Sequence, residues 1–352
     1  MSDRSETPSP APDDRLLRDA LEDTLARHFG HPERIVALER RPSPYRTSFP
    51  LEELTISLEK RGPLQLMFKN LSRQSLLRAA RLAKPQFLHD PEREIETYRL
   101  LLNPAQIGAP IYYGSIVDRA ASRYWLFIER VKGKELYQVG DLSTWQQVAR
   151  WLAVMHDHFA STCESPRDSA APGSLLKYER GLYERWMDRA RQFLKPASLS
   201  PDVRQRLERL AERYGDVVER LLALPQTVIH GEFYASNVLV EQTPAGLRVC
   251  PVDWELSAWG PGLLDLAALT AGSWTEEQKR ALALAYRDAL SPTSGWPPDA
   301  DTFLTALDCC HLHLAVQWVG WSPEWSPPPE HAQNWLAEAL RRSEKLGLVA
   351  KD

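Results

Sequence analysis

The 352-residue chain lacks several features that would assign it to a specialised class of protein. Its four cysteines show no CxxC spacing, and two of them, Cys309 and Cys310, are adjacent. This excludes a disulfide framework and a zinc site, and it favours a reducing cytosol as the location. No apolar run is long enough to span a membrane. The net charge is only −4, so neither a membrane nor nucleic acid is expected as a partner.

The first 14 residues, MSDRSETPSPAPDD, have no apolar signal core, and they predict a disordered segment. The remaining length is sufficient for two domains, and the hydrophobic fraction of 43% is ordinary for a globular protein. No internal repeat is present. The pattern predicts a β-rich part over 15–131 and a mainly helical part over 132–352.

The β-rich part begins with an expected helix over 15–29 that keeps its leucines on one face. Residues 54–60 alternate between apolar and polar side chains, and Arg61-Gly62-Pro63 turns the chain into a second run over 64–69. This arrangement predicts a hairpin. Further strands are expected over 34–41, 111–117 and 124–131, with helices over 73–82 and 91–102.

The helical part shows apolar residues at helical spacing over most of its length. Helices are expected over 145–159, 178–194, 201–224, 274–290, 301–319 and 330–346. One stretch of short apolar strands, 227–252, interrupts them.

That stretch carries the most specific motif. His230-Gly231-Glu232 follows an apolar strand, Asn237 comes five residues after Glu232, and a second apolar run delivers Asp253. The polar side chains are therefore expected at the ends of short buried strands. A carboxylate, an amide and a second carboxylate are what phosphoryl transfer needs, because one orients the attacking hydroxyl and two hold Mg²⁺ against the nucleotide phosphates. His230 is expected to orient the loop through backbone hydrogen bonds.

Lys69 ends the strand Leu-Met-Phe-Lys, where its ammonium could contact nucleotide phosphates. An acidic residue on the next helix would hold it, and Glu94 is the candidate. Glu92 and Glu96 are equally plausible as acids at the start of that helix. The alternative is an ordinary lysine at a strand end.

The sequences H-G-E-x-x-x-x-N, D-W-E, Leu-Met-Phe-Lys and Leu-Ala-Val-Met-His together resemble the aminoglycoside phosphotransferase and choline kinase branch of the protein-kinase-like fold. The resemblance covers most of residues 33–346. It implies a bilobal α+β fold with a small antiparallel sheet and a helix in the N-terminal lobe. Residues 15–131 would be the nucleotide-binding lobe, and 132–352 the larger, mainly helical, catalytic and substrate-binding lobe.

The resemblance also implies roles for residues of the N-terminal lobe. Lys69 would pair with Glu94 and contact the α- and β-phosphates of ATP or GTP. Residues 127–131 would form the hinge that contacts the adenine, with Glu129 and Val131 as the contacting residues.

In the C-terminal lobe, the resemblance places Glu232 at the position of the catalytic base. Asn237 and Asp253 would ligate Mg²⁺. Asp265 would brace the catalytic loop from the start of a helix.

The chain departs from the family pattern at two places. The base position is normally Asp, and the extra methylene of Glu232 moves the carboxylate by roughly 1.5 Å, a misplacement that can cost about a hundredfold in rate. Glu232 is therefore either a base in a reshaped site or a sign of reduced activity. The chain also lacks G-x-G-x-x-G, and the loop 43–48 contains no glycine. Thr47 and Ser48 could bind phosphate there, or the loop could be a plain polar hairpin loop.

A C-terminal aromatic cluster is a candidate substrate site, because Trp faces bind cations and stack on rings. The alternative is core packing, which is the usual role of Trp at helical spacing. The cluster contains Trp318, Trp321, Trp325 and Trp335, with His311 and His313 nearby in sequence.

The predicted function is transfer of the γ-phosphoryl group of ATP (or GTP), with Mg²⁺, to a hydroxyl of a small molecule. The acceptor could be aminoglycoside-like, a sugar, an amino alcohol or a natural-product intermediate. The alternative is a kinase-like nucleotide-binding or regulatory protein with little or no transfer activity. A metallohydrolase fails on spacing, because His230 and Glu232 have no second His at ligand distance. The oligomeric state stays open.

Overall fold

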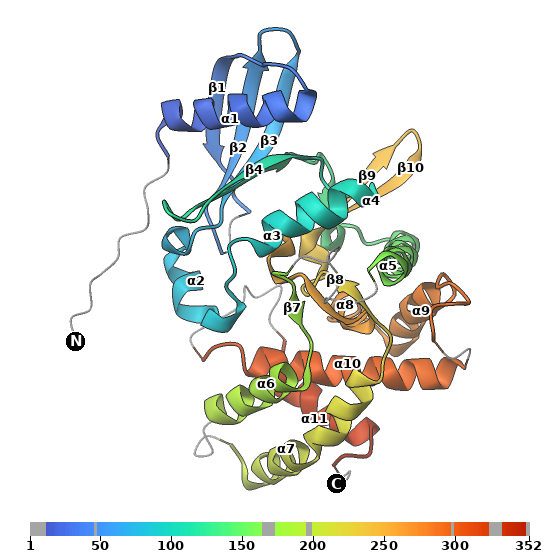
Figure 1. Ribbon diagram of the computed structural model, residues 1–352. Helices are drawn as coiled ribbons and strands as arrows, with labels where there is room; N and C mark the ends of the chain where they lie inside the picture. The colour runs from blue at the N-terminus through green and yellow to red at the C-terminus, as the bar shows by residue number, and fades with distance from the viewer. Residues whose placement is uncertain are drawn as a thin grey trace, which may run out of the picture. The chain divides into compact units, whose positions relative to one another are not determined.

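The computed structural model describes residues 12–45, 48–163, 173–194, 199–296, 299–323 and 333–349. The chain forms two compact units, Met1–Gly133 and Lys134–Asp352 (Figure 1). Most of the predicted disordered segment, residues 1–11, lies outside the described ranges. Within those ranges, no helix is long and apolar enough to cross a membrane.

The first unit contains the predicted antiparallel sheet. Its five strands have the order β1-β2-β3-β5-β4. Their bounds are β1 Ile35–Pro42, β2 Leu51–Leu58, β3 Pro63–Asn70, β4 Tyr112–Asp118 and β5 Arg123–Glu129. The predicted hairpin is the β2–β3 pair, in which Leu51 lies opposite Lys69.

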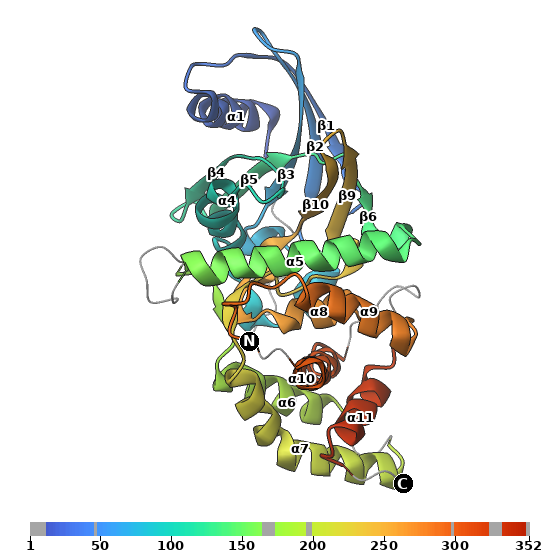
Figure 2. The same cartoon turned by 90° about the vertical axis from the view of Figure 1, so that its right-hand side faces the viewer.

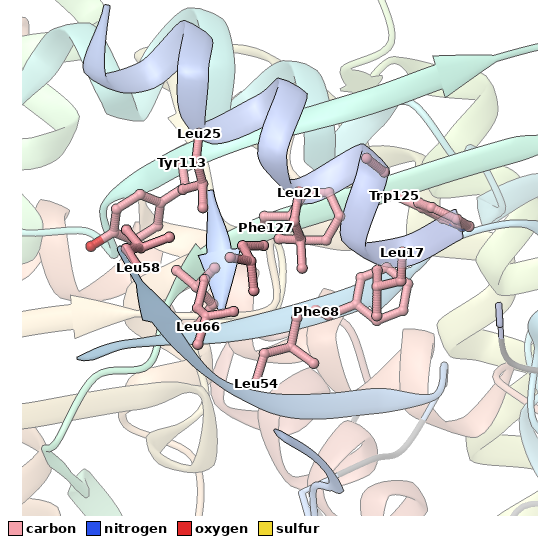
Figure 3. Packing of buried hydrophobic residues seen from close by; sticks show 13 residues of the cluster. Leu17, Leu21, Leu25, Leu54, Leu58, Leu66, Phe68, Tyr113, Trp125 and Phe127 are labelled. Atoms are coloured by element: carbon pink, nitrogen blue, oxygen red, sulfur yellow. The ribbon is translucent and has the colours of Figure 1, made fainter. Parts of the chain in front are cut away.

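Helix α1 (Asp14–Phe29) covers this sheet, and the contact between them is the core of the unit. Asp13 caps the helix by accepting a hydrogen bond from Leu16 N at 2.8 Å. Leu16, which was expected on the same face as the other leucines, is exposed. Leu17, Leu21 and Leu25 point into the sheet as predicted (Figure 3). They pack there against Leu54, Leu66, Phe68 and Phe127.

The segment between β3 and the next long helix differs from the prediction. The single helix expected over 73–82 is two short pieces, η1 (Arg73–Ser75) and α2 (Arg78–Ala83). The break occurs because Leu76 and Leu77 are extended, and Leu77 N donates a hydrogen bond to Ser48 O at 3.0 Å rather than to a helical carbonyl. A short helical turn, η2 (Gln86–Leu88), follows.

The helix expected over 91–102 is present, with an irregular middle. It consists of α3 (Arg93–Glu96), a π-helical segment η3 (Thr97–Leu102) and α4 (Asn103–Ala105). The wider turn of a π segment is a local feature that apolar periodicity does not predict.

The second unit is mainly helical, as predicted. The long helix α5 (Leu142–Thr162) packs against α9 and, less extensively, α8, and α10 packs against α8 and α11 (Figure 2). The remaining helices have these bounds: α6 Arg180–Phe193, α7 Pro201–Leu222, α8 Leu263–Leu269, α9 Glu276–Arg287, α10 Ala300–Val319 and α11 Trp335–Lys345. The four cysteines are buried and free, in agreement with the absence of a disulfide framework.

Two small sheets of this unit deliver the motif residues. One has the order β10-β9-β6 and the other β7-β11-β8. The strand bounds are β6 Lys134–Glu135, β7 Leu176–Lys177, β8 Gln226–Ile229, β9 Val238–Thr243, β10 Gly246–Pro251 and β11 Ala258–Pro261. Two short helical turns, η6 (Ala235–Asn237) and η7 (Trp254–Leu256), lie between strands, and η4 (Leu136–Gln138) follows β6.

Candidate active site

Residues 230–237, called the catalytic loop after the role that the family resemblance implies, leave the end of β8 and are held together by hydrogen bonds. His230 Nδ1 accepts a hydrogen bond from Glu232 N at 3.2 Å. Its Nε2–H can therefore donate to Val252 O, which lies 2.9 Å away. Asn237 Nδ2 donates to Glu232 O at 3.0 Å. The structure thus gives His230 the backbone-orienting position that was predicted.

The two halves of the motif meet through the β9–β10 hairpin. In this hairpin Val238 lies opposite Pro251, so the residues just outside the ladder are also neighbours. Val252 N donates to Asn237 O at 2.8 Å, and the next residue is Asp253. A single backbone hydrogen bond therefore holds Asn237 next to the residue that precedes Asp253.

Asp253 has a backbone conformation that is unusual for a residue other than glycine. Its φ of 66° and ψ of 60° lie in the left-handed region. That conformation costs on the order of 1–3 kcal/mol and persists where the surrounding structure enforces it, often at functional sites. Trp254, which is fully buried, supplies part of this enforcement by donating from Nε1 to Pro251 O at 3.1 Å.

Asp265 braces the catalytic loop from the first turn of α8, as the resemblance implied. Its carboxylate is completely buried. Oδ2 accepts from His230 N at 2.7 Å, and Oδ1 accepts from Gly231 N at 2.9 Å. Two consecutive backbone amides of the loop are thus held by one side chain, with charge-assisted hydrogen bonds.

A third hydrogen bond connects Asp265 to α5. Oδ2 lies 3.2 Å from His156 Nε2, and His156 Nδ1 lies 2.7 Å from the hydroxyl of Tyr286. Burial raises the pKa of Tyr286 well above the usual tyrosine value, so this hydroxyl keeps its proton and can donate to His156. A Cβ at Gly262 would lie 2.7 Å from His156 Nδ1, so glycine is needed for this approach.

Gly231→Ala is expected to disrupt the loop. Gly231 has φ +84°, and an added Cβ would lie 2.3 Å from the backbone oxygen of Leu256, which cannot move aside as a flexible side chain would. The strain alone should cost on the order of 1–3 kcal/mol, and the displaced Glu232 should lower any transfer activity. Thermal unfolding and phosphate-transfer assays would measure both effects.

Gly246→Ala provides the matched control. Gly246 also has a positive φ, +115°, but an added Cβ there meets no atom within 4 Å. This variant should lose stability through backbone strain and keep its activity. Equal activity of the two variants would show that the catalytic loop tolerates a shift at Gly231.

In the first unit, Lys69 and Glu94 form a buried ion pair. Lys69 Nζ lies 2.6 Å from Glu94 Oε2. The exposed fractions of the two side chains are 10% and 2%. Of the three acids that the sequence offered at this helix, Glu92 instead pairs with Arg119. Glu94 is therefore the partner that the resemblance implied.

The nucleotide contacts expected of Thr47, Ser48, Glu129 and Val131 stay predictions. Thr47 lies outside the described residues. Ser48 is described, and its carbonyl accepts the hydrogen bond from Leu77 N. The Glu129 carboxylate accepts a hydrogen bond from Ile111 N at 3.1 Å, and Glu129 N donates to Ile111 O at 2.9 Å. Val131 follows the end of β5.

The predicted aromatic cluster contacts the catalytic loop. The Trp318 indole N–H donates to the hydroxyl of Tyr234, two residues after Glu232. Trp318 stacks on Trp335 at a ring distance of 5.7 Å and contacts Trp321 at 5.4 Å. Trp321 is buried, whereas Trp318 and Trp335 are partly exposed. Trp325 lies outside the described residues.

The two histidines associated with this cluster belong to the core. His311 Nε2 lies 2.9 Å from Thr270 Oγ1, and His313 Nδ1 lies 2.7 Å from the Tyr214 hydroxyl. Burial lowers the pKa of His313 to about 3 and also lowers that of His311. Both rings are therefore neutral and packed, so the idea that they bind substrate is not supported.

Sequence reasoning missed three contributors to this site. Tyr234 sits inside the motif but shows no sequence signal for its contact with Trp318. The sequence Gly-Pro-Gly marks a turn at Gly262, but it gives no sign of the close approach to His156 that requires the glycine. Tyr286 lies in an ordinary amphipathic helix, and only its position opposite His156 gives it a role.

Comparison with known proteins agrees with the family resemblance seen in the sequence. A family described as the phosphotransferase enzyme family matches residues 70–301, about two thirds of the chain. A comparison with curated protein sequences finds no match.

Solved structures of several kinases are similar to this one. The choline kinase LicA from Streptococcus pneumoniae is 12% identical, with 95% of this chain and 98% of that chain covered and a TM-score of 0.54. The GDP complex of wild-type aminoglycoside 2'-phosphotransferase-IIIa is 14% identical, with 95% and 98% covered and a TM-score of 0.55. An ethanolamine kinase from Plasmodium vivax is 13% identical, with 87% and 82% covered and a TM-score of 0.53.

These structural similarities confirm the protein-kinase-like α+β fold predicted from the sequence. The match over residues 70–301 also confirms the predicted enzyme class, a phosphotransferase related to small-molecule kinases. The chain belongs to the phosphotransferase enzyme family.

Proposed function

We propose that this protein transfers the γ-phosphoryl group of ATP or GTP to a hydroxyl group of a small molecule, with Mg²⁺. The observation that carries the proposal is the hydrogen-bonded connection of Glu232, Asn237 and the backbone preceding Asp253. Such a rigid set of a carboxylate, an amide and a second carboxylate suits phosphoryl transfer, in which positioning and electrostatic stabilisation supply most of the catalysis.

The donor atoms of Asn237 and Asp253 fit Mg²⁺. The Asn237 amide nitrogen is used by Glu232 O, which leaves the amide oxygen as the ligand atom. Amide and carboxylate oxygens suit this hard cation, which usually binds one or two protein groups and completes its shell with water and substrate phosphates. In the described part of the chain, no group of three or more His, Cys, Asp or Glu side chains could hold a metal. Water and phosphate oxygens would therefore supply the remaining Mg²⁺ ligands. When bound, the ion would neutralise charge on the phosphates.

Glu232 would act on the acceptor. Its carboxylate would accept the proton of the acceptor hydroxyl as the hydroxyl oxygen bonds to the γ-phosphorus. The bond between the γ-phosphorus and the bridging oxygen then breaks, and the nucleoside diphosphate leaves. Two hydrogen bonds would hold the backbone of Glu232 in place during this step. Asn237 Nδ2 donates one to Glu232 O, and Glu232 N donates the other to His230 Nδ1.

The first unit would bind the nucleotide. Lys69, held by Glu94, would contact the α- and β-phosphates, and Glu129 and Val131 would contact the base. Ser48 and Thr47 would add contacts to the phosphates.

An alcohol that carries an amine is the acceptor class best supported. Structurally similar proteins include kinases named for choline, ethanolamine and aminopropanol. Tyr234 and Trp318 place aromatic rings next to the catalytic loop, and a cationic group over such a ring gains about 0.5–2 kcal/mol.

A substrate screen would test the proposal. Labelled ATP and GTP would be supplied separately with amino alcohols, aminoglycosides and neutral sugars, and phosphorylated products would be measured with and without Mg²⁺. We expect Mg²⁺-dependent transfer to at least one amine-bearing alcohol. Transfer to neutral sugars alone would contradict the acceptor class and leave the reaction type standing.

Glu232→Asp is expected to lower the transfer rate by about a hundredfold, because the carboxylate would withdraw by roughly 1.5 Å from an acceptor positioned for the longer side chain. Single-turnover transfer measures this rate directly. An unchanged or raised rate would mean that Glu232 is not a tuned base.

A nucleotide-binding protein with little or no transfer activity is the second candidate, and the Glu at position 232 is the observation that favours it. Measuring Mg·ATP binding together with slow ATP hydrolysis separates the two. Tight binding without hydrolysis or transfer to any acceptor would favour the second candidate.

A further inference from the structure

A basic pocket lies in the connection between β3 and α3, within the first unit. Six residues line it, and its volume is about 230 Å³. The lining consists of Arg73, Leu76, Arg81, Lys84, Gln86 and His89, so none of these described residues is a carboxylate. The whole stretch 71–89 contains four Lys or Arg and no Asp or Glu, although the chain as a whole carries a net charge of −4.

The pocket is built on a fixed backbone. Arg81 Nη2 donates to Gln74 O at 3.0 Å and to Leu76 O at 3.1 Å, which holds its guanidinium across the break between η1 and α2. Leu77 N is held by Ser48 O. Ser72 and Ser75 share a hydrogen bond of 2.6 Å at the start of the connection. The cations are therefore presented by an ordered segment.

Phe49 joins this pocket to the ion pair of the same unit. Its buried ring centre lies 5.6 Å from Lys84 Nζ, 5.8 Å from Lys69 Nζ and 6.0 Å from the ring of His89. One aromatic ring thus contacts a lysine of the pocket and the lysine proposed to bind nucleotide phosphates.

We propose that this pocket binds a phosphoryl group, carried by a polyphosphate or by a small phosphate ester. Arg and Lys are the side chains that bind phosphate most strongly, and Arg does so through a planar set of donors. Arg73, Arg81 and Lys84 place three permanent cations around a volume of about 230 Å³, which suits an anion of that size. The inference concerns binding alone and does not require that the protein transfer phosphate.

Calorimetric titration with sodium pyrophosphate at constant ionic strength tests the proposal. Wild-type protein should bind, and the double variant Arg73→Gln/Lys84→Gln should bind at least about tenfold more weakly, because two charged contacts are lost. Arg78→Gln is the matched control. Arg78 lies exposed on α2 outside the pocket lining, so this variant should bind like wild type.

Equal affinity in all three proteins, no binding by wild type at millimolar pyrophosphate, or equally strong binding of chloride would overturn the proposal. Thermal unfolding of each variant checks that the fold is retained. A repeat with saturating ATP identifies the source of the group: competition means that the nucleotide's own phosphates occupy the pocket, and retained binding means a separate phosphorylated ligand. Asp253→Asn, proposed to be inactive, should bind pyrophosphate normally, which separates this inference from the proposed function.

Discussion

Asp253→Asn is expected to abolish Mg²⁺-dependent phosphoryl transfer while the protein stays folded. The substitution removes the negative charge proposed to hold Mg²⁺, and the Asn side chain has the same number of non-hydrogen atoms as Asp. Loss of such a preorganised electrostatic contact lowers rates on the order of a thousandfold. Asn also tolerates the left-handed backbone that Asp253 adopts, so the local conformation should persist. Transfer of labelled phosphate, beside circular dichroism and thermal unfolding, measures both properties.

A second variant at this position separates strain from charge. Asp253→Gly should also be inactive, but it should unfold at a higher temperature than wild type, because glycine adopts φ near 66° without steric cost. Wild-type turnover by Asp253→Asn would remove the assignment of Asp253 as a metal ligand. A lower unfolding temperature for Asp253→Gly would show that the carboxylate contributes more stability than the strained backbone costs.

Lys69→Met is expected to give the largest loss of stability among the single variants considered. It would leave the Glu94 carboxylate buried without its cation, and breaking a buried ion pair from one side costs about 3–5 kcal/mol. Transfer activity should also be lost, because the phosphates would lose their proposed cation. Urea unfolding gives the free energy of unfolding, and labelled transfer gives the activity.

The double variant Lys69→Met/Glu94→Leu distinguishes the two roles of the pair. Removing both charges should restore most of the stability, since two apolar side chains can replace a buried pair with little net change, and activity should stay absent. Arg41→Met is the control, because it breaks an exposed pair with Glu39, and exposed pairs contribute at most about 1 kcal/mol. Activity in the double variant would contradict the proposed role of Lys69 in phosphate binding.

The sequence predicted well those features that depend on neighbouring residues. Alternation identified the β2–β3 hairpin, helical periodicity identified α5 and α10, and the spacing of the motif placed Asn237 and Asp253 at the ends of paired strands. These succeed because each pattern repeats over a whole element and is enforced by burial of one face.

Features that depend on a single distant contact were not predictable. The helix expected over 73–82 breaks because one amide, Leu77 N, bonds to a carbonyl 29 positions earlier in the chain. Strands β7 and β11 pair over only two residues, too few for alternation to register. Tyr286 has a role only because it meets His156, 130 positions away.

The bracing of the catalytic loop has a consequence for how variation in this chain should be interpreted. The loop amides depend on Asp265 of α8, which depends on His156 of α5, which in turn contacts Tyr286 of α9. The order of the loop is therefore supplied by three helices. A substitution on any of them can change catalysis without altering a residue of the motif, so an intact motif alone does not guarantee a working enzyme.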